Sequence, residues 1–178
     1  MKKLFVAVAE SSGDKFASEI LKDIHHLNIE GIGGEFLLKN VLKNSLVPLS
    51  DLSVMGFVEV LKKAFKLKAI IKKVAQHVID NNFDHVLSVD SYSFSIRIAE
   101  IVKKSKPSIK FIHVVAPSVW LYSQGRAEKL AKYYEKLFCL LPFEPAFFKK
   151  YGLDSEFIGY HGLYFQKNLK QTSDKNSI

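Results

Sequence analysis

Short apolar runs alternate with longer segments of helical periodicity along most of this sequence, and this alternation constrains the fold more than any other feature. Residues 4–9 form an apolar run of strand length, and residues 14–27 then place apolar side chains at the spacing of one helix face. The same pattern predicts further strands at 28–32, 86–89, 109–115, 137–141 and 156–158, and helices at 35–42, 52–79, 94–102, 124–134 and 144–150. The sequence therefore predicts an α/β fold with a Rossmann-like parallel sheet flanked by helices.

The length and composition favour one domain. The chain has 178 residues, of which 48% are hydrophobic, and this is enough to bury a sizeable single core. No internal repeat marks a second unit, so we expect one domain over residues 1–160. Residues 161–178 become polar and aperiodic, and we expect them to be a disordered tail.

The cysteine, histidine and glycine content gives no sign of a cofactor. Cys139 is the only cysteine and lies in an apolar run, so it is interpreted as a core residue in a reducing compartment. The six histidines follow no metal-ligand spacing, so no metal is expected. The run Gly31-Ile32-Gly33-Gly34 lacks the third glycine of a dinucleotide fingerprint and follows the second strand. We therefore expect no NAD either.

No targeting or membrane-spanning segment is evident. The apolar run after Lys2 and Lys3 is too short for a secretory signal, and nowhere do eighteen uncharged apolar residues follow one another. We expect a cytoplasmic protein.

The formal net charge of +8 is concentrated on the predicted helix at 52–79. Six lysines of this helix form a block at positions 62, 63, 66, 68, 72 and 73. Beside them lie apolar residues that the inward stripe of the helix does not require, namely Phe57, Val58, Val60, Leu61 and Phe65. No nucleic-acid recognition motif accompanies the lysines, so no nucleic-acid partner is expected. These apolar residues either pack on a neighbouring element or form a patch that lies on an anionic membrane surface.

Asp90 follows the apolar run 86–89, at the point where that strand is expected to end. Ligands of open α/β sheets collect outside the carboxyl ends of the strands, so a carboxylate at this point is a candidate general base. The alternative is that Asp90 caps a helix that begins near Phe94. The turn at Ser11-Ser12-Gly13 is similarly open to two interpretations, a backbone approach to an anion such as phosphate or a plain tight turn.

Several motifs, in the same order, resemble the N-terminal half of the lipid-A-disaccharide synthase family, a membrane-surface glycosyltransferase family of Gram-negative lipid A assembly. Residues 9–14, Ala-Glu-Ser-Ser-Gly-Asp, resemble the family's G-E-x-S-G-D turn, with Ala9 in place of the first glycine. Residues 54–61 match its V-M-G-x-x-E-V-L segment, and residues 113–120 are similar to its H-Y-V-S-P-S-V-W segment. Gly125-Arg126 then follows, and residues 141–144 match its L-P-F-E motif. The resemblance covers residues 4–159.

The resemblance implies one half of a GT-B glycosyltransferase, the acceptor side. The family reaction is an inverting, metal-independent transfer of 2,3-diacylglucosamine from UDP-diacylglucosamine to 2,3-diacylglucosamine 1-phosphate, an acylated glucosamine phosphate. Its products are the lipid A disaccharide 1-phosphate and UDP. The resemblance also implies a peripheral location on the inner membrane. We expect the domain that holds the UDP-sugar to be absent from this chain, and we expect the chain to be inactive unless a separate donor-domain chain complements it.

The resemblance also suggests roles for single residues. Asp90 would take a proton from the acceptor 6-hydroxyl. Glu10, Ser12 and Gly13 would line the cleft that faces the donor. Arg126 would meet a phosphate, and Ser118 and Trp120 would wall the sugar site. Arg126 is equally compatible with an ordinary charge on a helix surface, and Trp120 with a core side chain.

The sequence departs from the family at two places. The family's D-x-P-D-F-N reads here as Asp90-Ser91-Tyr92-Ser93-Phe94-Ser95, so the second carboxylate becomes Ser93 and the amide becomes Ser95. The F-I-G-H-P turn is altered after Gly159. A non-catalytic domain that binds the acceptor lipid or a membrane surface, or the remnant of an interrupted gene, is therefore the alternative to an enzyme.

Overall fold

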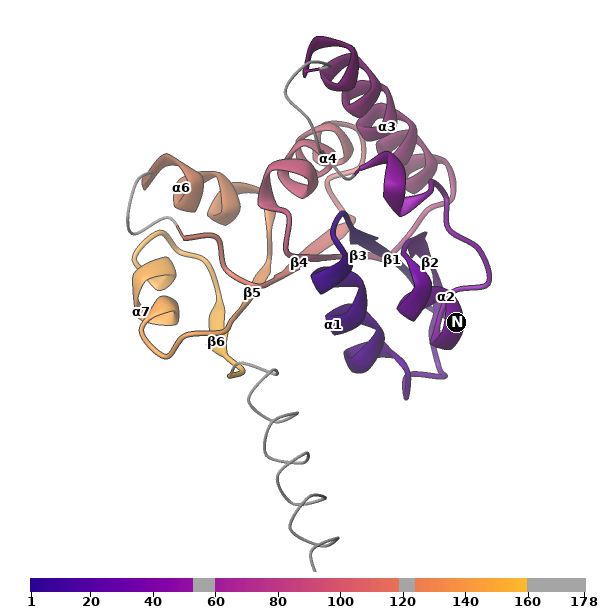
Figure 1. Cartoon of the computed structure of the whole chain (residues 1–178). Helices are drawn as coiled ribbons and strands as arrows, with labels where there is room; N and C mark the ends of the chain where they lie inside the picture. The colour runs from indigo at the N-terminus through magenta and orange to yellow at the C-terminus, as the bar shows by residue number, and fades with distance from the viewer. Residues whose placement is uncertain (53–59, 119–123, 160–178) are drawn as a thin grey trace, which may run out of the picture.

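The computed structural model describes residues 1–52, 60–118 and 124–159, and these form a six-stranded parallel sheet flanked by helices (Figure 1). The strands are β1 (Lys3–Val8), β2 (Asn28–Ile32), β3 (His85–Val89), β4 (Lys110–Val114), β5 (Lys136–Cys139) and β6 (Ser155–Phe157). Their order across the sheet is β2-β1-β3-β4-β5-β6, and every neighbouring pair is parallel. The predicted α/β fold with a Rossmann-like parallel sheet is confirmed.

The helices cover both faces of the sheet. They are α1 (Ser11–Leu21), α2 (Glu35–Asn40), the 3-10 turn η1 (Leu49–Asp51), α3 (Val60–Asp80), α4 (Tyr92–Ser105), α6 (Gln124–Tyr133) and α7 (Glu144–Lys149). Helices α1 and α2 lie on one face, and α3, α4 and α6 lie on the other (Figure 1). The sheet therefore separates two cores.

Successive side chains of β1 point to opposite faces of the sheet and therefore belong to different cores. Leu4, Val6 and Val8 belong to the core under α1 and α2, whereas Phe5 and Ala7 belong to the core under α3, α4 and α6. Each of the five is at most 7% exposed, so β1 is buried on both faces. A strand buried on both faces reads as a continuous apolar run, which is why the first strand was evident from the sequence.

Helix α1 begins at Ser11 and ends at Leu21, so the predicted bounds of 14–27 are wrong at both ends. The backbone N–H of Asp14 donates to the Glu10 carbonyl (3.0 Å), so Ser11, Ser12 and Gly13 form the first helical turn instead of a separate loop. Close packing favours glycine at position 13, because a Cβ atom added there would lie 3.0 Å from the Val89 carbonyl oxygen. The strand-to-helix turn is tight because α1 packs directly against the end of β3.

Asp14 fixes the start of helix α2 from across the fold. Its carboxylate is buried and accepts backbone N–H groups from Gly34 (2.7 Å), Phe36 (2.9 Å) and Leu37 (3.3 Å). These donors lie at the amino end of α2, where backbone N–H groups have no partner within the helix. A Cβ atom at Gly34 would lie 2.8 Å from the Asp14 carboxylate, so the glycine allows this contact. Gly34 thus allows close packing between α1 and the start of α2.

Three other sequence expectations have definite outcomes. Cys139 is fully buried, which confirms its interpretation as a core residue, and burial raises the pKa of its thiol to about 12. Helix α4 begins at Tyr92, two residues before the predicted start. None of the helices at 1–52, 60–118 and 124–159 is long and apolar enough to cross a membrane.

Several predicted features lie outside the described residues: Phe57, Val58, Trp120 and the tail at 161–178. Val60 and Leu61 lie in the first turn of α3, whose side chains are not described at these positions. Phe65, in the next turn of α3, is 73% exposed, so this side chain does not pack on a neighbouring described element.

The Asp14 contacts predict a large effect of one substitution. Asp14→Ala should lower the free energy of unfolding by about 2–4 kcal/mol, because it leaves buried N–H groups of α2 without an acceptor. Urea denaturation of the purified chain measures this change. Asp23→Ala removes the same charge at an exposed position beyond α1 and should cost less than about 0.5 kcal/mol. Equal midpoints for the two variants would contradict the capping role of Asp14.

Candidate active site

A cavity of about 610 Å³ lies where β1, β3 and β4 end. Its walls come from the segments after these strands, from α3, α4 and α6, and from the 3-10 turn. They consist of Ala9, Glu10, Ser11, Leu52, Leu67, Asp90, Ser91, Tyr92, Ser93, Phe94, Arg97, Val115, Pro117 and Arg126. The chain runs outward from β1 to β2 and then returns to β3, so the cavity lies at the switch point of the sheet, where α/β folds bind ligands.

Asp90 lies at the carboxyl end of β3 in an unusual backbone conformation. Asp90 and Ser91 both adopt left-handed φ values, 57° and 49°. The N-cap of α4 is Ser91, and no side chain caps this helix, so the alternative that Asp90 caps it is wrong. Instead, Asp90 Oδ1 accepts the backbone N–H of Ser91 (2.8 Å). The strained turn holds the carboxylate at the cavity wall.

A second strained residue follows the neighbouring strand. Val115, directly after β4, has φ of 76°, a conformation that is costly for a β-branched side chain. Its backbone N–H donates to the Phe138 carbonyl (3.0 Å), which ties this strained position to β5. Left-handed backbone therefore occurs after both β3 and β4, on the two sides of the cavity. Strain of this kind persists where the surrounding structure enforces it and is typical of ligand sites.

A buried polar cluster joins β3, β4 and the end of α6. Ser88 Oγ on β3 lies 2.7 Å from His113 Nδ1 on β4 and 3.4 Å from the Tyr134 hydroxyl after α6. Burial lowers the pKa of His113 to about 4 and raises the pKa of Tyr134 to about 12. Both side chains are therefore neutral near pH 7 and join β3, β4 and the end of α6. Sequence spacing gave no hint of this cluster.

Glu10 and Asp90, which lie far apart in the sequence, line the same cavity. Glu10 follows β1 and is exposed, and its Oε1 accepts the Ser91 hydroxyl (3.4 Å). Ser12 and Gly13 do not line the cavity, because Ser12 lies on the exposed side of α1 and Gly13 faces β3. Ser118 is exposed beyond Pro117 and is likewise not part of its wall. The motif residues thus divide into cavity residues and packing residues.

The two serines that depart from the family pattern differ in position. Ser95 is buried, and its hydroxyl donates to the Tyr92 carbonyl (3.2 Å), so it belongs to the interior of the fold. Ser93 is exposed and lines the cavity. Only Ser93 is therefore placed to contact a bound molecule.

Arginine side chains line the α6 side of the cavity. Arg126, in the first turn of α6, lies over the Tyr92 ring at 5.7 Å from its centroid. Arg97, on α4, also lines the cavity and was missed from the sequence. The position of Arg97 one turn after Ser93 was the available signal, because residues four apart share a helix face.

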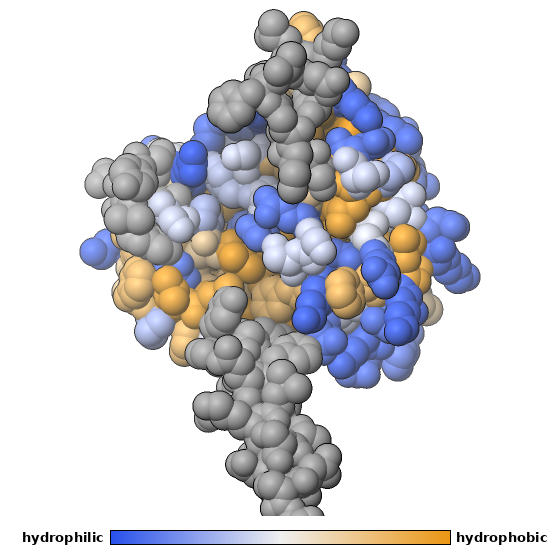
Figure 2. Space-filling view, in the orientation of Figure 1, coloured by the Kyte–Doolittle hydropathy of each residue, from blue (hydrophilic) through white to orange (hydrophobic). Residues whose placement is uncertain are grey.

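The acidic residue of the L-P-F-E motif, Glu144, has a structural role. Glu144 is buried and accepts the backbone N–H groups of Leu140 and Leu141, both at 3.0 Å. Burial raises the pKa of its carboxyl group. Leu141, Phe143, Phe157 and Ile158 are exposed. Figure 2 shows apolar residues at the surface on the side of β6 and α7.

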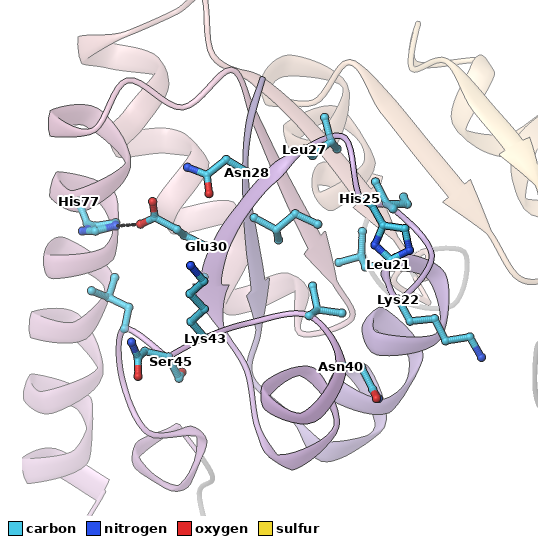
Figure 3. Close-up of a pocket in the computed structure, with 16 residues that line it drawn as sticks. Leu21, Lys22, His25, Leu27, Asn28, Glu30, Asn40, Lys43, Ser45 and His77 are labelled. Carbon is cyan, nitrogen blue, oxygen red and sulfur yellow. Dashed lines mark hydrogen bonds and ion pairs between the residues drawn. The ribbon is translucent and has the colours of Figure 1, made fainter. Parts of the chain in front are cut away.

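A second cavity of about 750 Å³ lies beside the open edge of β2, and Figure 3 shows its lining. Here Glu30 on β2 meets His77 of α3 at 3.3 Å (Figure 3). None of the site residues predicted from the sequence lines this cavity. The cavity at the strand ends is therefore the candidate active site. Within the described ranges, no cluster of three His, Cys, Asp or Glu side chains could hold a metal ion.

The fold is a Rossmann-like α/β domain of the type found in GT-B proteins. It resembles UDP-GlcNAc 2-epimerase from Neisseria meningitidis, a structure solved with UDP-GlcNAc. The TM-score is 0.58 at 13% identity, over 86% of this chain and 43% of that chain. This likeness concerns the fold alone.

Sequence comparison identifies the family. The model of the lipid-A-disaccharide synthetase family matches residues 4–177. The lipid-A-disaccharide synthases of Rickettsia bellii (strain OSU 85-389) and Rickettsia akari (strain Hartford) are 43% and 41% identical over 163 residues. The chain belongs to the lipid-A-disaccharide synthase family, which is a family of glycosyltransferases. The match continues to residue 177, so the expectation that the likeness ends near Gly159 is wrong. The chain spans 43% and 42% of the lengths of these two relatives.

Buried His113 predicts a pH-dependent stability. Its pKa is about 4 in the folded chain, below its ordinary value of 6.5, so between these values the unfolded chain binds more protons. The free energy of unfolding should therefore fall as the pH drops from 6.5 to 4, by up to about 3 kcal/mol from this residue. Urea denaturation across this pH range measures the change.

The matched comparison uses a second histidine. His113→Gln should lose much of this pH dependence, although it also lowers stability at pH 7. His26→Gln, at an exposed position, should keep the pH dependence of the parent chain. The same pH dependence in all three proteins would show that His113 is not buried in its neutral form.

Proposed function

We propose that this chain supplies the acceptor side of a lipid-A-disaccharide synthase. The reaction is transfer of 2,3-diacylglucosamine from its UDP conjugate to 2,3-diacylglucosamine 1-phosphate, which gives lipid A disaccharide 1-phosphate and UDP. The observation that carries the proposal is the position of Asp90, in a cavity at the sheet's switch point, within a chain of this family. The match covers less than half of the length of these relatives, and we assign the UDP-sugar site to the part of their length outside the match.

Asp90 acts as the general base in this proposal. Its Oδ1 accepts the Ser91 N–H, and within the described structure Oδ2 has no hydrogen-bond partner. Oδ2 accepts the proton of the acceptor 6-hydroxyl as the oxygen attacks the anomeric carbon of the donor. The new C–O bond forms on the face opposite UDP, which leaves with the electron pair of the broken bond, so the configuration inverts. The backbone turn orients the carboxylate before the acceptor binds.

The other predicted residues surround this centre. We assign Glu10, which lines the cavity, to the wall that faces the donor. Trp120 follows β4 in the sequence, and we assign it to the wall of the sugar site. We assign Arg126 to a phosphate group, because a guanidinium donates two parallel hydrogen bonds to phosphate oxygens.

Helix α3 supplies the membrane contact in this proposal. Phe65 is 73% exposed and is followed by the exposed Lys66 and Lys68. Leu67, between the two lysines, lines the cavity. A membrane contact at Phe65 therefore brings the lipid surface close to the cavity, where an acylated acceptor can enter without leaving the bilayer completely. Attachment through one helix face is peripheral and reversible.

The role of Asp90 is tested in a chimeric enzyme that joins this chain to the region of the Rickettsia bellii relative that lies outside the match. Asp90→Asn should lower turnover by roughly a hundredfold or more, the scale of a lost general base, with little change in the acceptor KM. Radiolabelled disaccharide product measures both parameters.

Asp23→Asn is the matched control, because it makes the same chemical change at an exposed site and should leave turnover unchanged. Undiminished turnover of Asp90→Asn would remove Asp90 from the mechanism. An inactive parent chimera that binds the acceptor would favour a domain that binds without catalysis.

The membrane contact predicts co-sedimentation of the chain with vesicles that contain phosphatidylglycerol. Phe65→Ser should reduce the bound fraction severalfold, since it removes an apolar side chain worth about 1.5–3 kcal/mol when buried. Higher salt should also weaken binding, because each lysine near an anionic surface contributes about 1 kcal/mol. Leu38→Ser, at an exposed position on α2, is the control and should bind like the parent. Binding that is insensitive to both salt and Phe65→Ser would contradict this contact.

A further inference from the structure

The candidate active site continues into a second hollow between α4 and α6. This hollow has a volume of about 400 Å³ and shares Tyr92, Ser93, Arg97 and Arg126 with the cavity that contains Asp90. The two hollows are therefore one groove, with Asp90 in one part and both arginines where the two parts meet.

Arginine is rare in this chain, which makes its placement informative. Only two of the 26 basic residues are arginines, Arg97 and Arg126, and both line this groove. They come from different helices, α4 and α6, and lie 29 positions apart in the sequence. Arginine differs from lysine in the planar, forked donor geometry that fits phosphate and carboxylate groups. The fold thus brings the two arginine side chains of the protein to the same groove.

The charge of this part of the groove is not neutralised by the protein. Over the described ranges, neither Arg97 nor Arg126 forms an ion pair, and both are exposed. The one carboxylate among the residues that line the hollow between α4 and α6 is Glu100, and Lys129 pairs with it at 2.9 Å. Two guanidinium groups are therefore left to attract an anion.

Two further features favour an anion at this position. Arg126 packs over the Tyr92 ring, which limits the freedom of its guanidinium group. Gly125, in the first turn of α6, is exposed and lines the hollow between α4 and α6, so the first turn of this helix lies at the groove. The helix dipole places partial positive charge there.

The opposite end of the groove is apolar. Leu52, Leu67 and Phe94 line the part of the cavity next to α3. Helix α4 lies between α3 and α6 (Figure 1), so the apolar and cationic ends lie on opposite sides of α4. A molecule that fills the groove needs an apolar end, a central hydroxyl near Asp90 and an anionic end.

We propose that Arg97 and Arg126 together clamp the phosphate monoester of the acceptor, with its acyl chains directed towards α3. This inference rests on the proposed function and adds Arg97 as a binding residue and a direction for the acceptor. A phosphate monoester carries close to two negative charges, which two guanidinium groups can balance. Its three terminal oxygens can accept the hydrogen bonds that these groups donate. The clamp fixes the sugar so that its hydroxyl reaches Asp90.

Isothermal titration of the purified 178-residue chain with glucosamine 1-phosphate tests the clamp without the donor or the membrane. Binding should be saturable, and Arg97→Gln or Arg126→Gln should each weaken it about tenfold, as expected for a lost charged hydrogen bond. Arg97→Lys should restore only part of the affinity because it lacks the forked geometry. Lys104→Gln, an exposed charge change on the same helix, should have no effect.

Other ligands identify the source of the phosphate. Glucosamine without phosphate should bind at least tenfold more weakly. UDP that binds as tightly as glucosamine 1-phosphate, with the same dependence on the arginines, would assign the clamp to the donor and overturn the proposal. Loss of vesicle co-sedimentation in Arg97→Gln would assign it to membrane headgroups and overturn it as well.

The clamp and the proposed reaction fail in different ways. Glucosamine 1-phosphate binding that is unaffected by both Gln variants would refute the clamp, whatever the chimeric enzyme does. Arginine-dependent binding together with an inactive chimera would leave the clamp intact and refute the reaction.

Discussion

All six strands run parallel, and this constraint determines where the protein can do chemistry. Every strand ends at the same edge of the sheet, so residues far apart in sequence meet there. Glu10 after β1, Asp90 after β3 and Val115 after β4 line one cavity for this reason. The switch in direction between β1 and β3 opens space at this edge, because the following segments diverge to opposite sides.

The motif residues that match the family divide into two groups with different physical roles. Gly13, Asp14 and Glu144 are buried and hold elements together through close packing and backbone hydrogen bonds. Glu10 and Asp90 reach the cavity. The buried group keeps the strand ends in place, so that the strained backbone at Asp90 and Val115 is enforced by its surroundings.

The strands and the place of Asp90 were predictable because a buried strand leaves a largely apolar run, and Asp90 is the first charged residue after the run that forms β3. The start of α1 could not be predicted from the sequence. Ser11, Ser12 and Gly13 have low helix propensity and become helical only by packing against β3. The contacts between Ser88 and His113, and the convergence of Arg97 with Arg126, also depend on pairings across the fold. Such pairings leave no periodicity in a single sequence, whereas the family motifs could be matched residue by residue.

The central claim is that the acceptor binds at the strand ends with its attacking hydroxyl on Asp90. A crystal structure of the chain with a soluble, short-chain analogue of 2,3-diacylglucosamine 1-phosphate tests it most directly. The account predicts the 6-hydroxyl oxygen about 2.6–3.2 Å from an Asp90 carboxylate oxygen, the distance a general base requires. An analogue bound in the cavity beside β2, or bound at the strand ends with its 6-hydroxyl directed away from Asp90, would contradict it.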